Sequence, residues 1–144
     1  MQETTVMQIR KVMTIPAITG ASDASIREIA RLMRDHDIGL IPIVLDGSPV
    51  GVLTDRDIVT RILPVADVPA EITAARAMSD HPVTCHMDQD VAEAASIMGD
   101  NQVRRLLVVD HDDRLVGILS LGDIAENVSE GLAGQALGEV VELR

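Results

Sequence analysis

The residues with the clearest chemical potential occur twice, each time as a hydroxyl followed three positions later by a carboxylate. Thr54-x-x-Asp57 and Ser120-x-x-Asp123 both follow an apolar run of β character. An ionised Asp accepts hydrogen bonds at two oxygens, which suits the two hydroxyls of a ribose. The Thr or Ser hydroxyl and the first amides of a following helix suit a phosphate. Asp57 and Asp123 equally fit a structural role as helix caps, and the spacing alone leaves both interpretations open.

Both motifs belong to a longer internal repeat, which is the most informative feature of the chain. A shift of 65 positions places Met13 on Met78, Thr19 on Thr84, Asp23 on Asp88, Glu28 on Glu93, Met33 on Met98 and Val44 on Val109. After one inserted residue in a polar turn, a shift of 66 places Val50-Gly51 on Val116-Gly117 and Asp57-Ile58 on Asp123-Ile124. So long an ordered series indicates a duplication.

Each copy predicts the same order of elements: a short extended stretch, a helix, two strands and a second helix. The first helices are predicted from apolar residues at helical spacing, namely Ile26, Ile29, Ala30 and Met33 in one copy and Val91, Ala94, Ala95 and Met98 in the other. Asp23 or Ser22 is expected to cap the earlier helix. The strands, 40–45 with 50–53 and 106–109 with 115–119, are separated by short polar turns and should therefore pair antiparallel.

One copy of about 60 residues buries little apolar surface alone, so the two copies are expected to share a core. We therefore predict an α/β (α+β) fold of two β-α-β-β-α repeats, packed sheet to sheet about a pseudo-twofold axis. The expected organisation is repeat 1 over residues 7–63, a linker with a short helix over 64–76, repeat 2 over 77–128 and a C-terminal tail over 129–144.

This arrangement resembles a tandem pair of cystathionine-β-synthase-type (CBS) domains, also called a Bateman module. The motifs that carry the resemblance are Val12-Met13-Thr14, Ile41-Pro42-Ile43-Val44 and Val50-Gly51-Val52-Leu53-Thr54-Asp55-Arg56-Asp57-Ile58, with their counterparts in the second copy. The stretches 33–39 and 53–59 look especially like stand-alone bacterial two-CBS proteins of the hypoxic-response type. No enzyme or channel is attached in this sequence, so a regulated partner would be a separate chain.

The resemblance implies an adenosine-containing ligand, such as AMP, ADP, ATP, NAD or S-adenosylmethionine, in two clefts between the repeats. Carried over by position, one cleft would combine Val52, Thr54 and Asp57 with Val83, Val103 and Arg104. The other would combine Ile118, Ser120, Asp123 and Arg105 with Ile18, Ile38 and Gly39. No Phe, Tyr or Trp is present, so adenine would lie between aliphatic side chains near Ile18 or Val83.

Three arginines are the candidate phosphate partners in these clefts, because a guanidinium fork suits phosphate. They are Arg56, Arg104 and Arg105, and the alternative for each is a solvated position or a pairing with surplus carboxylates. The second cleft has Arg105 where the first has Leu40. The two clefts should therefore differ in anion affinity, and one of them could be purely structural.

The composition excludes several broad functions. The formal charge of −11 and the absence of Phe, Tyr and Trp argue against binding to nucleic acid or to an anionic membrane surface. A single cysteine, the absence of a signal-peptide pattern and the absence of a long apolar run predict a soluble cytoplasmic protein. No nucleophile elbow, Walker loop or His-Glu-x-x-His motif is present, so no enzymatic activity and no required cofactor are expected.

His81, Cys85 and His86 form a weaker constellation of metal-ligand types close together in the sequence. No second cysteine completes a structural zinc set, so isolated turn histidines are the preferred interpretation and no metal is predicted.

The expected function is a non-catalytic sensor of energy or redox state that acts as a homodimer and signals to an unknown partner. The alternatives are a dimeric scaffold with empty clefts and a His/Cys metal-responsive protein. In the scaffold, Asp57→Ala would cost only a helix cap, about 1 kcal/mol.

Overall fold

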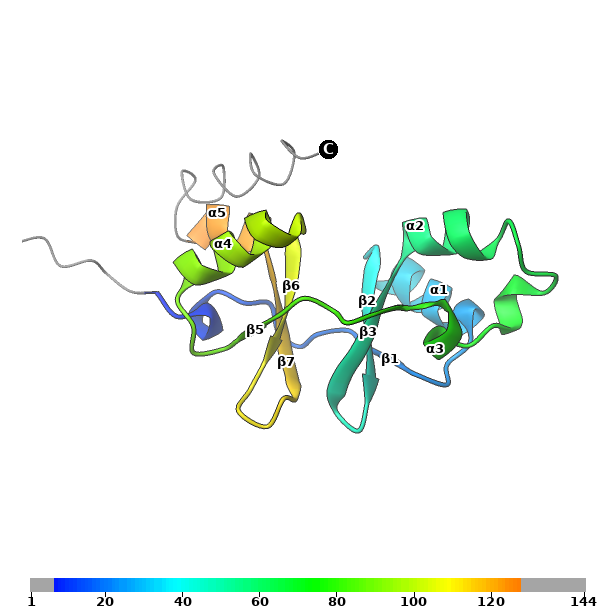
Figure 1. The fold of residues 1–144 in the computed structure, drawn as a ribbon, viewed down its shortest axis with the longest axis horizontal. Coiled ribbons are helices and arrows are strands. Elements are labelled where there is room, and N and C mark those ends of the chain that lie inside the picture. Colours follow the sequence, from blue (N-terminus) through cyan, green and yellow to red (C-terminus); the bar gives the residue numbers. More distant parts are fainter. Residues whose placement is uncertain (1–6, 128–144) are drawn as a thin grey trace, which may run out of the picture. The chain divides into compact units, whose positions relative to one another are not determined.

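The two repeats form two compact units, and each unit contains a short segment from outside its own repeat. The computed structural model describes residues 7–127. Of the described residues, 18–82 form the first-repeat unit, and 7–17 together with 83–127 form the second-repeat unit. Figure 1 shows a β-sheet with helices packed against it in each unit. The predicted mixed fold with two sheets is confirmed.

The first-repeat unit is built on a four-stranded sheet in the order β1-β2-β3-β4. Its elements are β1 (Gly20–Ala21), α1 (Ile26–His36), β2 (Leu40–Leu45), β3 (Ser48–Thr54), α2 (Asp55–Asp57), the π-helical turn η2 (Ile58–Ile62), the 3-10 turn η3 (Pro69–Glu71), α3 (Ala74–Ala77) and β4 (Ser79–Asp80). The predicted antiparallel pairing holds for β2 with β3, while β1 joins β2 in parallel.

The second-repeat unit has a three-stranded sheet in the order β5-β6-β7. Its elements are the 3-10 turn η1 (Ile9–Lys11), β5 (Thr84–His86), α4 (Val91–Asn101), β6 (Arg105–Val109), β7 (Leu115–Ser120) and α5 (Leu121–Asn127). Strands β5 and β6 are parallel and β6 and β7 are antiparallel, which repeats the pattern of the first unit.

The first helix of each repeat forms where the apolar spacing predicts it. Helix α1 begins after Ser25, whose hydroxyl accepts a hydrogen bond from the amide of Glu28, and ends at Asp37 with φ of 52°. The expected cap at Asp23 or Ser22 was wrong, because the chain stays non-helical until Ile26. Side chains at the predicted apolar positions are buried in both helices, except that Ala30 is exposed.

The segment that precedes each repeat packs on the sheet of the other repeat. Thr14 forms an isolated antiparallel bridge with Ile118 of β7, and Ser79 on β4 pairs in the same way with Val52 of β3. Thr14 and Ser79 are equivalent under the 65-residue shift. Each sheet is therefore extended at the equivalent edge, beside β7 or β3, by a segment from outside its own repeat. The compact units therefore differ from the predicted ranges 7–63 and 77–128.

Each unit has its own apolar core. In the first-repeat unit, Ile26, Ile29 and Met33 of α1 pack against β2 and β3. In the second-repeat unit, the equivalent face of α4 packs against β6 and β7 together with Ile9 and Cys85. No helix within residues 7–127 is long and apolar enough to cross a membrane. The tail predicted over 129–144 lies outside the described residues.

Candidate functional site

The first hydroxyl–carboxylate motif forms a capping box at the junction of β3 and α2. The Thr54 hydroxyl accepts a hydrogen bond from the Asp57 amide at 3.1 Å, and Asp57 Oδ2 accepts one from the Thr54 amide at 3.1 Å. The other oxygen, Oδ1, lies 3.5 Å from Nη1 of Arg61. The Asp57 side chain is 20% exposed, so it is accessible to solvent but largely packed against the protein.

The second motif repeats this geometry where β7 meets α5. Asp123 Oδ2 accepts a hydrogen bond from the Ser120 amide at 2.9 Å, and the Ser120 hydroxyl accepts one from the Asp123 amide at 3.0 Å. The Thr14 hydroxyl lies 3.3 Å from each oxygen of the Asp123 carboxylate and donates to it. Asp123 is half-buried.

Both motifs thus cap their helices, which was the structural interpretation of the sequence. Capping engages one carboxylate oxygen fully and leaves acceptor capacity on the other, because an ionised carboxylate offers about four lone-pair sites. At Asp57 the remaining oxygen lies beside a guanidinium, and at Asp123 it lies beside a hydroxyl. The geometry is therefore compatible with recognition of a diol, and capping and binding do not exclude each other.

Gly39 lies next to the first capping box, although the resemblance assigns it, with Ile18 and Ile38, to the cleft of the second motif. The Gly39 carbonyl accepts a hydrogen bond from the Asp55 amide at 3.0 Å, at the start of α2. A Cβ at Gly39 would lie 2.9 Å from Oδ2 of Asp55, so a larger residue does not fit there without displacing that carboxylate. Ile38 and Ile18 pack against the core of the same unit, and Val52 lies on β3 two residues before Thr54.

The second capping box has a corresponding set of neighbours. Arg105 is the register partner of Ser120, and the Arg104 carbonyl accepts a hydrogen bond from the amide that follows Ser120, at 3.0 Å. Val83 and Val103 pack against the core of this unit. Ile118, on β7, exchanges two backbone hydrogen bonds with Thr14, of 2.8 and 3.1 Å.

The three candidate phosphate-binding arginines are exposed. None of the ion pairs found among residues 7–127 involves Arg56, Arg104 or Arg105. In this part of the chain, these arginines therefore do not pair with surplus carboxylates, which was one of the interpretations of the sequence. Their guanidinium groups remain accessible to an anion.

Two polar residues at these sites were missed by reasoning from the sequence. Thr14 donates to Asp123 although it lies 109 positions earlier. Arg61 lies beside Asp57 and donates from Nη1 to the Ser79 hydroxyl at 3.2 Å. The repeat does contain a signal, because Thr14 and Ser79 are equivalent positions and both carry hydroxyls. Arg61 also follows Asp57 by four residues, a spacing that places two side chains on the same face of a helix.

The residues first considered as metal ligands do not form one set. Cys85 is buried in the second-repeat core, and burial raises the pKa of its thiol to about 12, so the thiolate that binds metal is disfavoured. The side chain of His81 is 94% exposed and lies 3.9 Å from Asp80. His86 instead lies beside Asp88 and His111, two residues that sequence reasoning did not connect with it.

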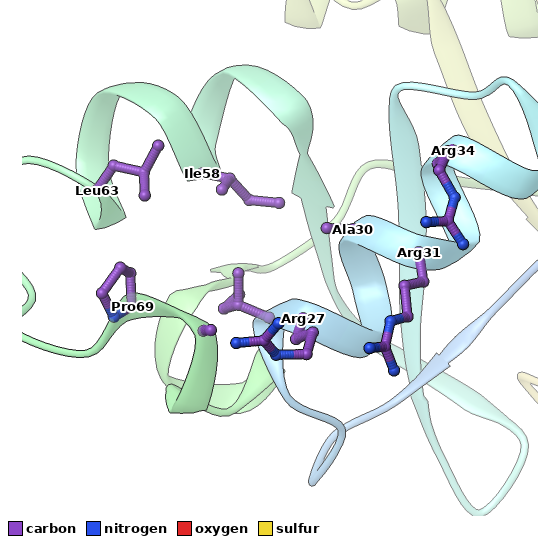
Figure 2. Close-up of a pocket in the computed structure, with 9 residues that line it drawn as sticks. Arg27, Ala30, Arg31, Arg34, Ile58, Leu63 and Pro69 are labelled. Atoms are coloured by element: carbon purple, nitrogen blue, oxygen red, sulfur yellow. The ribbon is translucent and has the colours of Figure 1, made fainter.

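A separate groove of about 490 Å³ lies in the first-repeat unit between α1, η2 and the segment around η3. Figure 2 shows Ile58, Leu63 and Pro69 across the groove from the arginines of α1, which are Arg27, Arg31 and Arg34. None of the predicted ligand residues lines it. Its apolar walls and basic rim are features of a contact surface.

Both repeats match one family model, described as CBS domain, over residues 9–64 and 70–130. The CBS domain-containing protein YhcV of Bacillus subtilis is 35% identical over 133 residues, which are 92% of this chain and 94% of that protein. Hypoxic response protein 1 of Mycobacterium tuberculosis is 38% identical over 102 residues, covering 70% and 71%. The chain also matches an uncharacterized protein of Methanopyrus kandleri, MK0525, at 37% identity over 76% of this chain, and spans only 56% of that relative.

Solved structures share the fold. The crystal structure of Hypoxic Response Protein I with two coordinated zinc ions has a TM-score of 0.77 at 32% identity, covering 85% of this chain and 99% of that one. The CBS domain pair of protein MJ0100, in complex with 5′-methylthioadenosine and S-adenosyl-L-methionine, has a TM-score of 0.73 at 29% identity, covering 85% and 95%. One relative is named as an enzyme, L-aspartate semialdehyde sulfurtransferase of Methanocaldococcus jannaschii, but the match covers 22% of it.

Proposed function

Because this chain belongs to the CBS-domain family, as a tandem pair of repeats, we propose that it binds an adenosine-containing ligand and signals the binding to a separate protein. A CBS domain pair is in general a regulatory rather than a catalytic module. The solved MJ0100 pair, at 29% identity, is in complex with 5′-methylthioadenosine and S-adenosyl-L-methionine. The location in clefts between the repeats, implied by the resemblance, is part of the proposal.

The observation that carries the proposal is the repetition of one polar arrangement at two strand–helix junctions. Each arrangement contains a capping hydroxyl and a half-buried carboxylate. At Asp123 the Thr14 hydroxyl of the exchanged segment donates to the carboxylate, and at Asp57 the Arg61 guanidinium lies beside the carboxylate and donates to Ser79 of the other exchanged segment. A cap needs only the first two groups. The Thr14 hydroxyl at one motif and the Arg61 guanidinium at the other are polar groups that helix formation does not require, and they fit a site that recognises a sugar.

In this proposal Asp57 and Asp123 accept the ribose hydroxyls, as an acceptor-only carboxylate does. The base lies against aliphatic side chains, with Ile18, Ile38, Val52, Val83, Val103 and Ile118 as the candidates. Arg105 is the favoured partner for a phosphate or carboxylate, followed by Arg104 and Arg56. Thr54 and Ser120 already accept hydrogen bonds from the Asp amides, so their free hydroxyl protons remain as donors to the ligand.

The arginines distinguish the two sites and therefore bear on the ligand. Exposed Arg105 lies beside the second capping box, whereas its counterpart beside the first is the half-buried Leu40. A ligand with phosphates should favour the site with Arg105, and an uncharged ligand such as 5′-methylthioadenosine has no such preference. The proposed ligand class is AMP, ADP, ATP, NAD or S-adenosylmethionine and its relatives.

Differential scanning calorimetry with these compounds tests the function. A ligand at about 100 times its Kd stabilises the folded chain by about 2.7 kcal/mol, which raises Tm by several degrees. The double variant Asp57→Ala/Asp123→Ala should remove the shift, while Asp55→Ala, which removes an exposed carboxylate next to the first motif, should retain it. An unchanged Tm with every compound would contradict the proposal.

The groove between α1 and η2 favours self-association as a second element of the function. Leu63 is 52% exposed at the groove and Val59, one turn away, is 59% exposed. Such exposed apolar side chains favour a protein contact. We therefore retain the homodimer as part of the proposal, with sedimentation velocity as its test: a monomer at micromolar concentration would argue against it. The regulated partner and a cytoplasmic location are likewise proposals.

A further inference from the structure

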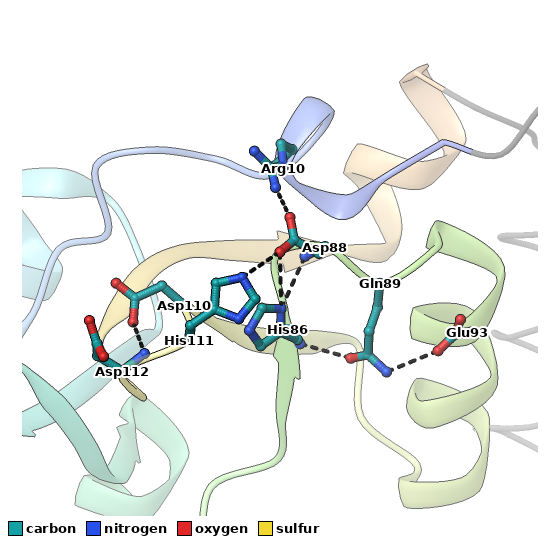
Figure 3. Close-up of polar contacts among 8 residues, drawn as sticks. All are labelled: Arg10, His86, Asp88, Gln89, Glu93, Asp110, His111 and Asp112. Carbon is teal, nitrogen blue, oxygen red and sulfur yellow. Dashed lines mark hydrogen bonds and ion pairs between the residues drawn. The ribbon is translucent and has the colours of Figure 1, made fainter.

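One end of the second-repeat sheet carries a cluster of three polar side chains, His86, Asp88 and His111. None of them belongs to either capping box. One ligand-type atom from each residue lies within 4.8 Å of the others. Nε2 of His111 is 2.9 Å from Oδ2 of Asp88, and Nδ1 of His86 is 3.8 Å from the same oxygen. The centres of the two imidazole rings are 4.4 Å apart. Figure 3 shows both rings on one side of the Asp88 carboxylate.

These separations suit ligands that share one metal ion. Bonds of 2.0–2.2 Å in a tetrahedral arrangement place neighbouring donor atoms about 3.3 Å apart. The distances of 2.9 Å from Asp88 to His111 and 3.8 Å from Asp88 to His86 lie on either side of this value. All three ligand atoms lie within 4.8 Å of one another, so binding one ion would require the side chains to move closer together.

Neighbouring hydrogen bonds hold the backbone that carries the three ligands. The His86 amide donates to Gln89 Oε1 at 2.8 Å, and the Gln89 side chain donates to Glu93 at 3.0 Å. The turn that carries His111 is ordered by Asp110, whose Oδ1 accepts from the amides of Asp112 and Arg114. Supports of this kind are what orient ligands at metal sites.

Two existing contacts would be shared or replaced when a metal binds. Arg10 contacts Oδ1 of Asp88, which leaves Oδ2 as the oxygen facing the histidines. Nδ1 of His86 accepts a hydrogen bond from the Asp88 amide at 3.2 Å, and coordination through this nitrogen would replace that bond. The carboxylate would thus bind through one oxygen while Arg10 keeps the other.

The first repeat shows that the fold itself does not require this cluster. Ala21 occupies the position of His86, with the same register against the neighbouring strand: Ala21 pairs with Val44, and His86 with Val109. Asp23 stands at the position of Asp88, but the paired histidine is missing. The two imidazoles are therefore a property of the second repeat rather than of the architecture.

We propose that His86, Asp88 and His111 bind a divalent transition-metal ion of the Zn²⁺ type. Two imidazole nitrogens and one carboxylate oxygen suit zinc and its first-row neighbours, whereas Mg²⁺ and Ca²⁺ prefer oxygen alone. The His111 side chain is 79% exposed, so the remaining coordination positions face solvent and are open to water or to a group from another molecule. This inference is independent of the proposed adenosine ligand.

Isothermal titration calorimetry with ZnCl₂ on the full chain tests the proposal. The wild type should bind one Zn²⁺ at this site, and MgCl₂ should give no heat of binding. His111→Gln should weaken zinc binding by about 100-fold or more, beyond the 10–100-fold typical of losing a supporting group. The matched control His81→Gln removes an exposed histidine outside the cluster and should leave affinity unchanged.

Asp88→Asn supplies a second variant, and circular dichroism confirms that each variant folds. With Co²⁺ in place of zinc, the wild type should show the visible absorption of a low-coordinate cobalt site, and His111→Gln should lose it. Absence of zinc binding, equal affinity in wild type and His111→Gln, or loss of binding in His81→Gln would each overturn the proposal. Adenosine binding by the same preparations is scored separately, so failure here leaves that function intact.

Discussion

Cys85 lies on β5 with 4% of its surface exposed, inside the core of the second-repeat unit. Burial penalises the charged thiolate and raises the pKa of this thiol from 9.0 to about 12. At neutral pH the thiol is therefore protonated and acts as a small apolar side chain. A redox or metal-binding role for Cys85 has no support from this environment.

The buried thiol predicts a loss of stability at alkaline pH. Between about pH 9 and pH 12 the unfolded chain ionises Cys85 while the folded chain does not, so the free energy of unfolding falls with rising pH. The slope approaches about 1.4 kcal/mol per pH unit in the middle of this range. Because the chain has one Lys and no Tyr, few other groups titrate there.

Urea denaturation at pH 8, 9, 10 and 11 measures this slope, with Cys85→Ala as the matched variant. The variant is less stable at pH 8 because it loses buried volume, but its curve should be flatter above pH 9. Parallel curves for the two proteins would show that the thiol ionises as readily in the folded state as in the unfolded one.

Single residues of the candidate sites were predictable where the duplication repeats them. Thr54, Asp57, Ser120 and Asp123 form the expected pairs, since both members lie within four positions of one another. Thr14 was not predicted to join Asp123, because the sequence assigns it to the opposite repeat and only the fold brings it across. Local spacing identifies local pairs, and it carries no information about the segment exchange.

At the level of elements, each exchanged segment, around Thr14 or Ser79, packs its backbone closely against a glycine of the neighbouring strand. A Cβ at Gly51 would lie 2.8 Å from the Ser79 carbonyl oxygen, and a Cβ at Gly117 would lie 3.0 Å from the Thr14 carbonyl oxygen. Met78 and Met13 pack over the same two glycines. The absence of a side chain at these two glycines therefore allows β4 to pair with β3, and the segment around Thr14 to pair with β7.

Gly51→Ala should destabilise the chain by about 1–3 kcal/mol, because the new methyl group overlaps a backbone oxygen that cannot move without separating β4 from β3. Gly122→Ala is the control, since its Cβ would meet nothing closer than 3.5 Å and the residue lies in α5. That change should raise stability by up to about 1 kcal/mol. Urea denaturation of both variants measures the difference, and equal effects would contradict the packing described.

Helix and strand positions followed from periodicity more closely than helix ends did. The apolar spacing located α1 and α4 and the antiparallel strand pairs correctly. The first cap lies at Ser25 rather than at the expected Asp23 or Ser22, because several polar residues precede the helix and all of them are plausible caps. The turn carrying His111 shows the same limit, since its place beside His86 depends on how β5 and β6 align.

At the scale of the molecule, duplication produced two units of one design with different side chains at equivalent places. Arg105 corresponds to Leu40, and His86 corresponds to Ala21. The shared features, a capping box and an exchanged hydroxyl, belong to the proposed sugar recognition. The residues that differ, Arg105 and His86, give the proposed anion preference and the proposed metal site to the second repeat alone. The two units should therefore respond to different chemical signals.

The central claim is that the repeated carboxylates recognise ribose. The most direct measurement is calorimetric titration of the chain with the adenosine compound that stabilises it most and with the 2′,3′-dideoxy form of that compound. Hydrogen bonds to a charged group contribute about 1.5–3 kcal/mol each, so the wild type should bind the dideoxy form at least about 10-fold more weakly. In the Asp57→Ala/Asp123→Ala variant this discrimination should disappear, whereas Asp55→Ala should keep it. Equal discrimination in the double variant and the wild type would contradict the account.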